Sequence, residues 1–144
     1  MSMFGLDFAA LVAAGFLATL GMTLAGYLLG AGGLTYFDLD LLLVSRIDPR
    51  QSAPGIGLVI HFLIGIGLAA FYILLWHPAG DTNLLSGMLY GVGLWAIAMV
   101  VVLPLAGRRV FAVDLGWRRS AALLASHLVY GAAIAGLYPL LSSA

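Results

Sequence analysis

The chain has 144 residues, of which 63% are hydrophobic and only 8% are charged, and its formal net charge is zero. Soluble domains carry about 25% charged residues, and a chain of this size has too little interior to bury so much apolar surface. The composition therefore excludes an ordinary water-soluble domain, and the zero net charge argues against nucleic-acid binding. The absence of cysteine removes disulfides and thiolate metal sites.

Four long apolar runs follow one another along the chain, at about 8–31, 55–76, 84–106 and 120–141. Each run is long enough, at about 1.5 Å per residue, to cross a hydrocarbon core of about 30 Å as a helix. The runs are apolar on all sides, which favours helices over the alternating strands of a membrane barrel. We therefore predict a single all-α domain over residues 1–144, built as a polytopic four-transmembrane-helix bundle.

The connecting segments carry all the basic residues, and these are all arginine. The arginines lie between the first and second runs and between the third and fourth runs: Arg46, Arg50, Arg108, Arg109, Arg118 and Arg119. Under the positive-inside rule both arginine-bearing segments face the cytoplasm. The sequence thus predicts a multi-pass membrane protein with both termini outside.

Two segments between the runs are too short to span a bilayer, at about 32–46 and 108–119. We expect both to lie along the membrane interface. Trp76 and Trp117 are expected at opposite membrane faces, where tryptophan is common. Trp95 falls near the middle of the third run instead, and the sequence shows no partner for its indole N–H.

One pattern, His-x3-Gly-x6-Tyr, occurs in both the second and the fourth run. On a helix, offsets of four and eleven residues return to nearly the same face, so each copy forms one stripe. The internal repeat predicts two parallel-repeat helical hairpins in the same orientation. The two stripes are the candidate site: His61, Gly65, Tyr72, His127, Gly131 and Tyr138.

Three interpretations of the stripes stay open. In the first, each neutral imidazole bonds a carbonyl or hydroxyl group on a neighbouring helix, which fixes the register of the bundle. The second is a bis-histidine b-type haem between the second and fourth helices, with the two glycines admitting the flat ring. The third is a polar site for a quinone, lipid headgroup, proton or small substrate, lined by the two tyrosines. The candidate partners in the first interpretation are Thr19, Thr23, Ser86 and Tyr130.

Small residues four positions apart occur in every run, and in lipid such pairs let helix backbones approach closely. They therefore favour a tight four-helix bundle. The pairs are Gly26-x3-Gly30, Gly65-x3-Ala69, Gly87-x3-Gly91, Gly131-x3-Ala135 and Ala132-x3-Gly136.

Four stretches of the chain resemble one family of small bacterial membrane proteins. They are GFLATLGMTLAGYLLG (15–30), IHFLIGIGLAAFYILLW (60–76), LYGVGLWAIAMVVVLPLAG (89–107) and SHLVYGAAIAGLY (126–138). The chain is similar to the DUF6789 family, whose function is unknown. The resemblance implies a four-span protein of the bacterial cytoplasmic (inner) membrane, and it brings no activity with it.

The sequence contains no phosphate-binding loop, zinc-protease motif or nucleophilic triad, and we expect no catalytic activity of its own. The leading hypothesis is an accessory subunit in the lipid bilayer. It packs against other membrane subunits or a second copy of itself, in an electron-transfer complex of the respiratory or photosynthetic kind. The alternatives are a haem- or quinone-binding subunit and a small transporter or channel. No nucleic-acid partner is expected.

Overall fold

In a computed structural model of the chain, the described residues are 2–3, 6–31, 54–76, 83–114 and 116–143. Almost all of them are helical. The elements are β1 (Ser2–Met3), β2 (Leu6–Asp7), α1 (Phe8–Ala31), α3 (Pro54–Trp76), α4 (Leu84–Ile97), the π-helical turn η3 (Ala98–Val102), α5 (Leu103–Leu105), the 3-10 turn η4 (Val110–Ala112) and α6 (Trp117–Ser142). The two short strands pair with each other in antiparallel fashion, just before α1.

The helices are long and apolar enough to cross a membrane four times, with α4, η3 and α5 together forming the third span. The prediction of an all-α, polytopic four-helix bundle is therefore confirmed. The largest difference from the predicted boundaries lies at the fourth span, where α6 begins at Trp117 instead of about residue 120. The predicted interfacial segment at 32–46 lies outside the described residues.

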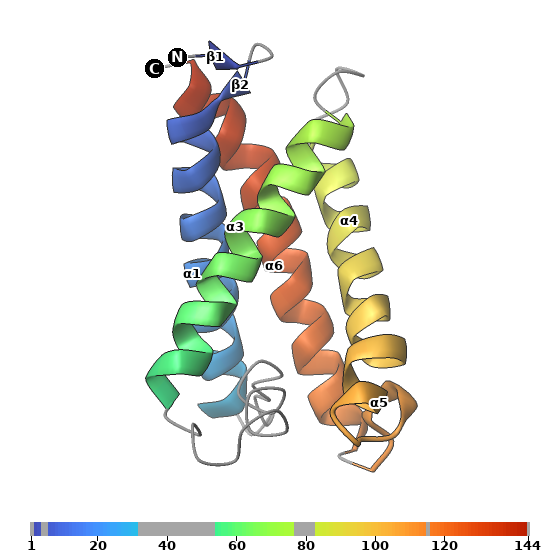
Figure 1. The fold of residues 1–144 in the computed structure, drawn as a ribbon. Helices are drawn as coiled ribbons and strands as arrows, with labels where there is room; N and C mark the ends of the chain where they lie inside the picture. The colour runs from blue at the N-terminus through green and yellow to red at the C-terminus, as the bar shows by residue number, and fades with distance from the viewer. Residues whose placement is uncertain (1, 4–5, 32–53, 77–82, 115, 144) are drawn as a thin grey trace.

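The four spans run alternately down and up the bundle (Figure 1). Helices α1 and α4 begin at the end that holds both chain termini, and α3 and α6 return to it. The hairpins α1–α3 and α4–α6 therefore have the same orientation, as the internal repeat predicts. We call this end of the bundle the termini end. The opposite end, which carries Arg108, Arg109, Arg118 and Arg119, is the arginine end.

Helix α6 packs against both α1 and α4, and α3 packs against α1. The buried face of α1 includes three alanines, of which Ala14 and Ala18 are completely buried. They share one core cluster with Ile134 and Tyr138 of α6. Because alanine projects only a methyl group, α6 comes close to α1 while its own large side chains fill the space between them.

The starts of α1 and α4 are capped by side chains. The backbone N–H of Ala10 donates to Oδ1 of Asp7, at 3.0 Å. Asn83 and Ser86 form a reciprocal capping box at α4, in which each side chain accepts a backbone N–H of the other residue. These bonds satisfy N–H groups that have no partner within the helix.

The third span ends at Gly107, which has a φ angle of 79°. The N–H groups of Gly107 and Arg108 donate back to the carbonyl oxygens of Pro104 and Leu103, both at 2.9 Å. This is the Schellman arrangement, in which a left-handed glycine closes a helix. One turn earlier, the N–H of Leu103 bonds to Ala98, five residues back. The resulting π turn directly precedes Pro104, which lacks an N–H group.

Candidate functional site

The six stripe residues lie inside the bundle. Five of them are buried, and only His61 is half-buried. Tyr72 and Tyr138 have exposed fractions of 0% and 2%, and His127 has 8%. The stripes therefore form inward-facing surfaces of α3 and α6, as the helical spacing predicts.

Helix α3 crosses the bundle diagonally, from α1 at the arginine end to α4 at the termini end (Figure 1). The part of its stripe near the arginine end therefore contacts α1, and the part near the termini end contacts α4. Near the upper end, the phenol oxygen of Tyr72 lies 2.7 Å from Oγ of Ser86. This bond ties the stripe to the capping box that begins α4.

Gly65 is the point where α3 meets both α1 and α6. A Cβ atom placed on this glycine would collide with the side chain of Thr19 in α1. Its carbonyl oxygen accepts a hydrogen bond from the hydroxyl group of Tyr130 in α6. One turn along, a Cβ atom on Gly15 would lie 3.0 Å from Cβ of Ala69. The predicted small-residue pair Gly65-x3-Ala69 therefore packs against α1.

Gly131 meets α4 instead. A Cβ atom on Gly131 would collide with the backbone of Gly87, and one on Gly91 would collide with the carbonyl oxygen of His127. The two helices thus touch backbone to backbone, and the predicted pairs Gly87-x3-Gly91 and Gly131-x3-Ala135 form this contact. The predicted pair Ala132-x3-Gly136 does not bring Gly136 against another helix, because nothing lies within 4 Å of a Cβ atom on this glycine.

The histidines lie at similar heights in the bundle. The hydroxyl group of Tyr130 reaches the carbonyl oxygen of Gly65, and the histidines lie three and four residues before these residues on helices that run in the same direction. Nδ1 of His127 lies 2.7 Å from the carbonyl oxygen of Leu123, one turn back in its own helix. The first interpretation places such a bond on a neighbouring helix, whereas this one lies within α6. Nε2 of His61 is buried.

The side chains suggested as histidine partners make bonds of their own. The hydroxyl groups of Thr19 and Thr23 donate to carbonyl oxygens one turn back in α1, at 2.7 and 2.8 Å. Ser86 contacts Tyr72, and Tyr130 bonds Gly65. The two threonines thus bond within α1, and Ser86 and Tyr130 bond between helices.

The haem interpretation needs open space beside both stripe glycines, on the faces where α3 and α6 approach one another. The structure places α1 against Gly65 and α4 against Gly131, so the two glycines face different helices. A flat ring would therefore have to displace a helix at each of them. Across the described part of the chain, no group of three or more His, Cys, Asp or Glu residues is placed to hold a metal ion.

Two residues that link the helices were not singled out as site residues from the sequence. Tyr130 precedes the stripe glycine of α6, and the same position in α3 is occupied by Ile64, which is exposed. The repeat therefore gives no signal for Tyr130, because its two copies have different residues at this position. Tyr90 of α4 donates its hydroxyl proton to the carbonyl oxygen of Leu68, at 2.8 Å.

Trp95 finds its partner across the α4–α6 contact. Its Nε1–H donates to the carbonyl oxygen of Ser120 in the first turns of α6, at 3.1 Å. Oγ of Ser120 lies 3.6 Å from Sδ of Met99, one turn further along the third span. This side chain therefore joins α4 to α6 near the arginine end, which accounts for a tryptophan within the third span.

Helices α3 and α4 leave a groove between them on the membrane-spanning surface. The two helices are joined near the termini end by the Tyr72–Ser86 and Tyr90–Leu68 bonds, and they diverge toward the arginine end (Figure 1). An apolar groove of about 440 Å³ lies between them. We call it the α3–α4 groove, and its lining residues are Leu68, Phe71, Trp76, Leu89, Tyr90, Gly93, Leu94 and Ile97.

The comparisons with known proteins add no assignment to this geometry. No family model, curated protein or solved structure matches the chain. Membership of the DUF6789 family therefore stays a prediction of the sequence.

Proposed function

We propose that the protein is an accessory subunit of a larger membrane assembly, and that it holds a transmembrane helix of a neighbouring subunit in the α3–α4 groove. The groove is the observation that carries this proposal. The bundle is closed by direct contacts of α1 with α3, α1 with α6 and α4 with α6. On the α3–α4 side, the described residues leave an apolar groove along the spans.

The lining of the groove suits a helix. Gly93 lies on α4, and nothing lies within 4 Å of a Cβ atom placed on it. On another face of α4, Gly87 and Gly91 already bring the backbone of α6 into contact. In lipid, close approach at small residues is the main source of helix association, so Gly93 offers a second such position. The exposed side chains of Phe71 and Leu89 would then flank the incoming helix.

The polar groups of the spans also support a structural role. The phenols of Tyr72, Tyr90 and Tyr130 each make a hydrogen bond between helices, and the indole of Trp95 makes a fourth. Hydrogen bonds between helices stabilise a membrane bundle, which fits a structural role. The electron-transfer setting of the assembly stays a prediction of the sequence.

We further propose that the arginine end faces the cytoplasm of a bacterial cell and that both termini lie outside. The described part of the termini end contains no arginine, whereas the arginine end carries four. Such a bias over short connecting segments sets the orientation of membrane proteins.

The proposal is tested by filling the groove. Gly93→Leu places a bulky side chain in the groove, and Gly136→Leu places the same side chain on an exposed face of α6 outside it. Both positions have open space, so both variants should keep the fold. Each protein is expressed in its native host, extracted in a mild detergent and examined by light scattering and mass spectrometry.

We expect the wild-type chain and Gly136→Leu to be extracted with a stoichiometric partner, and Gly93→Leu to be extracted without it. A partner of the same mass identifies a second copy, and a different mass identifies another subunit. A wild-type protein that comes out as a stable monomer, or a Gly93→Leu variant that keeps its partner, would overturn the proposal.

A further inference from the structure

A second groove lies at the arginine end, away from the α3–α4 groove. It has a volume of about 490 Å³ and lies between the third span, η4 and the start of α6. We call it the arginine-end groove. Its apolar lining comes from Trp95, Phe111, Val113, Trp117, Ala121 and Leu124.

The backbone at this groove holds an aromatic side chain in an unusual position. Phe111 has a φ angle of 57°, in the left-handed region that is costly for a bulky residue. Its ring lies 5.9 Å from the ring of Trp95, so the two aromatic rings contact each other at this groove. Even so, Phe111 is 47% exposed, and Val113 and Trp117 are 60% and 74% exposed. The groove is thus rimmed by large apolar side chains that have no protein cover within the described chain.

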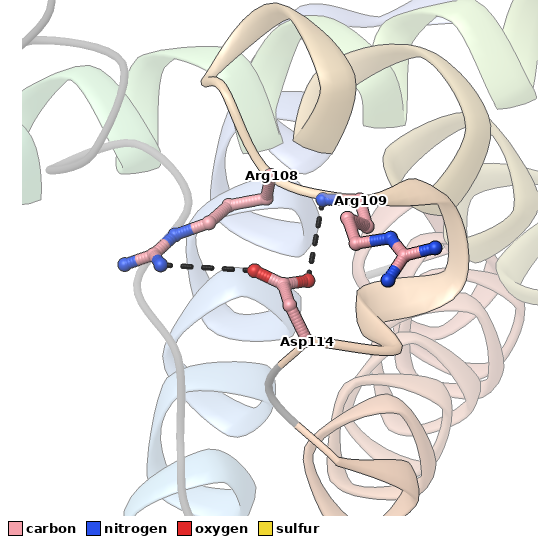
Figure 2. Close-up of polar contacts among 3 residues, drawn as sticks. All are labelled: Arg108, Arg109 and Asp114. Carbon is pink, nitrogen blue, oxygen red and sulfur yellow. Dashed lines mark hydrogen bonds and ion pairs between the residues drawn. The ribbon is translucent and has the colours of Figure 1, made fainter.

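The segment that borders the same groove carries positive charge. Four guanidinium groups lie between the end of the third span and the first turn of α6, and Asp114 is the one carboxylate among the described residues of that segment. Figure 2 shows how this carboxylate is used: Oδ2 lies 3.7 Å from Arg108, and Oδ1 accepts the backbone N–H of Arg109 at 3.2 Å. The guanidinium group of Arg109 points away from Asp114 (Figure 2).

One guanidinium group lies next to a residue of the groove wall. Cζ of Arg118 is 5.9 Å from the ring centroid of Trp117, which lines the groove. The site therefore combines an apolar trough with a positive charge beside it. Phosphate groups are strong partners of arginine, and acyl chains are the natural occupants of an apolar trough at membrane depth.

We propose that the arginine-end groove binds one anionic phospholipid. Its acyl chain lies against Phe111, Trp117 and Leu124, and its phosphate group lies beside Arg118. The apolar lining selects a lipid over a soluble phosphate compound, and the excess of arginine selects an anionic headgroup over a zwitterionic one.

The test uses the full-length protein in a neutral detergent and counts bound lipids by native mass spectrometry. The probes are a phosphatidylglycerol and a phosphatidylcholine with identical acyl chains, and inorganic phosphate alone. Arg118→Gln removes one charge at the rim, and Ala121→Phe fills the trough without changing charge. Gly136→Phe places the same ring on an exposed face of α6 outside the groove and is the matched control for Ala121→Phe.

We expect one phosphatidylglycerol to be retained in preference to phosphatidylcholine. Arg118→Gln should weaken its retention about fivefold, the usual effect of one basic residue at an anionic membrane surface. Ala121→Phe should weaken the retention of both lipids, and Gly136→Phe should leave it unchanged. Equal retention of the two lipids, displacement of the lipid by inorganic phosphate, or normal retention by Ala121→Phe would each overturn the proposal.

Discussion

The hydroxyl group of Tyr130 in α6 donates a hydrogen bond to the carbonyl oxygen of Gly65 in α3. The same glycine lies against the side chain of Thr19 in α1. Three of the four spans therefore meet at one residue that has no side chain. The carbonyl oxygen of Gly65 has a second lone pair beyond its bond within the helix, and Tyr130 uses it.

We expect Tyr130→Phe to lower the free energy of unfolding by about 0.6 kcal/mol, and by no more than about 1.7 kcal/mol, the range measured for single hydrogen bonds inside membrane bundles. Tyr130→Leu should cost clearly more, because it also leaves a cavity where the ring packs. Both values follow from titration with a denaturing detergent, monitored by helical circular dichroism. If Tyr130→Phe unfolds at the same detergent concentration as the wild-type protein, the bond to Gly65 contributes nothing to stability.

The contact between α4 and α6 gives a second prediction. A methyl group on Gly131 would enter the backbone of Gly87, whereas one on Gly93 would meet open space. Gly131→Ala should therefore destabilise the bundle by about 1–3 kcal/mol through overpacking. Gly93→Ala adds the same methyl group in the same helix pair and should cause no loss of stability. The same detergent titration compares the two variants, and equal behaviour would mean that α4 and α6 do not touch at Gly131.

The fold was predictable from the sequence because one physical requirement dominates it. In lipid every backbone N–H and C=O group needs an internal partner, so each long apolar run has to be a helix. The repeat added the common orientation of the two hairpins, and glycine spacing indicated where helices touch. Gly87 and Gly131 show the last point, because both lie in predicted small-residue pairs and both form the contact.

The partner of each stripe could not be read from the sequence. Helical spacing shows that His61, Gly65 and Tyr72 share one face, but it does not show which helix covers that face. The diagonal course of α3 decides this, and it brings Gly65 to α1 and Tyr72 to α4 (Figure 1). The α3–α4 groove has the same origin. It arises from the crossing angle of two helices, for which the chain contains no local signal.

The start of α4 gives a third prediction. Oδ1 of Asn83 accepts the backbone N–H of Ser86 at 3.0 Å, and Oγ of Ser86 also contacts Tyr72 of α3. Asn83→Ala removes the cap and should lower the free energy of unfolding by about 1 kcal/mol. Ser142→Ala is the control, because Ser142 is exposed near the end of α6, and its loss should change stability by less than about 0.5 kcal/mol. A variant of Asn83 as stable as the control would rule out a contribution from the capping box.

The proposed orientation gives the last prediction, and the chain makes its test simple. Because the protein has no cysteine, a single introduced cysteine is its only thiol. Val113 is 60% exposed at the arginine end, and Ser143 is exposed just after α6 at the termini end. Neither position lies in the core, so Val113→Cys and Ser143→Cys should both fold normally.

In intact bacterial spheroplasts, a membrane-impermeant maleimide should label Ser143→Cys at once and Val113→Cys only after the membrane is permeabilised. The physical reason is that moving four arginines across the bilayer is far more costly than moving termini that carry none in their described parts. Labelling of both variants after permeabilisation verifies that each thiol is accessible. The reverse order of labelling would place the arginine end outside the cell and would contradict the proposed orientation.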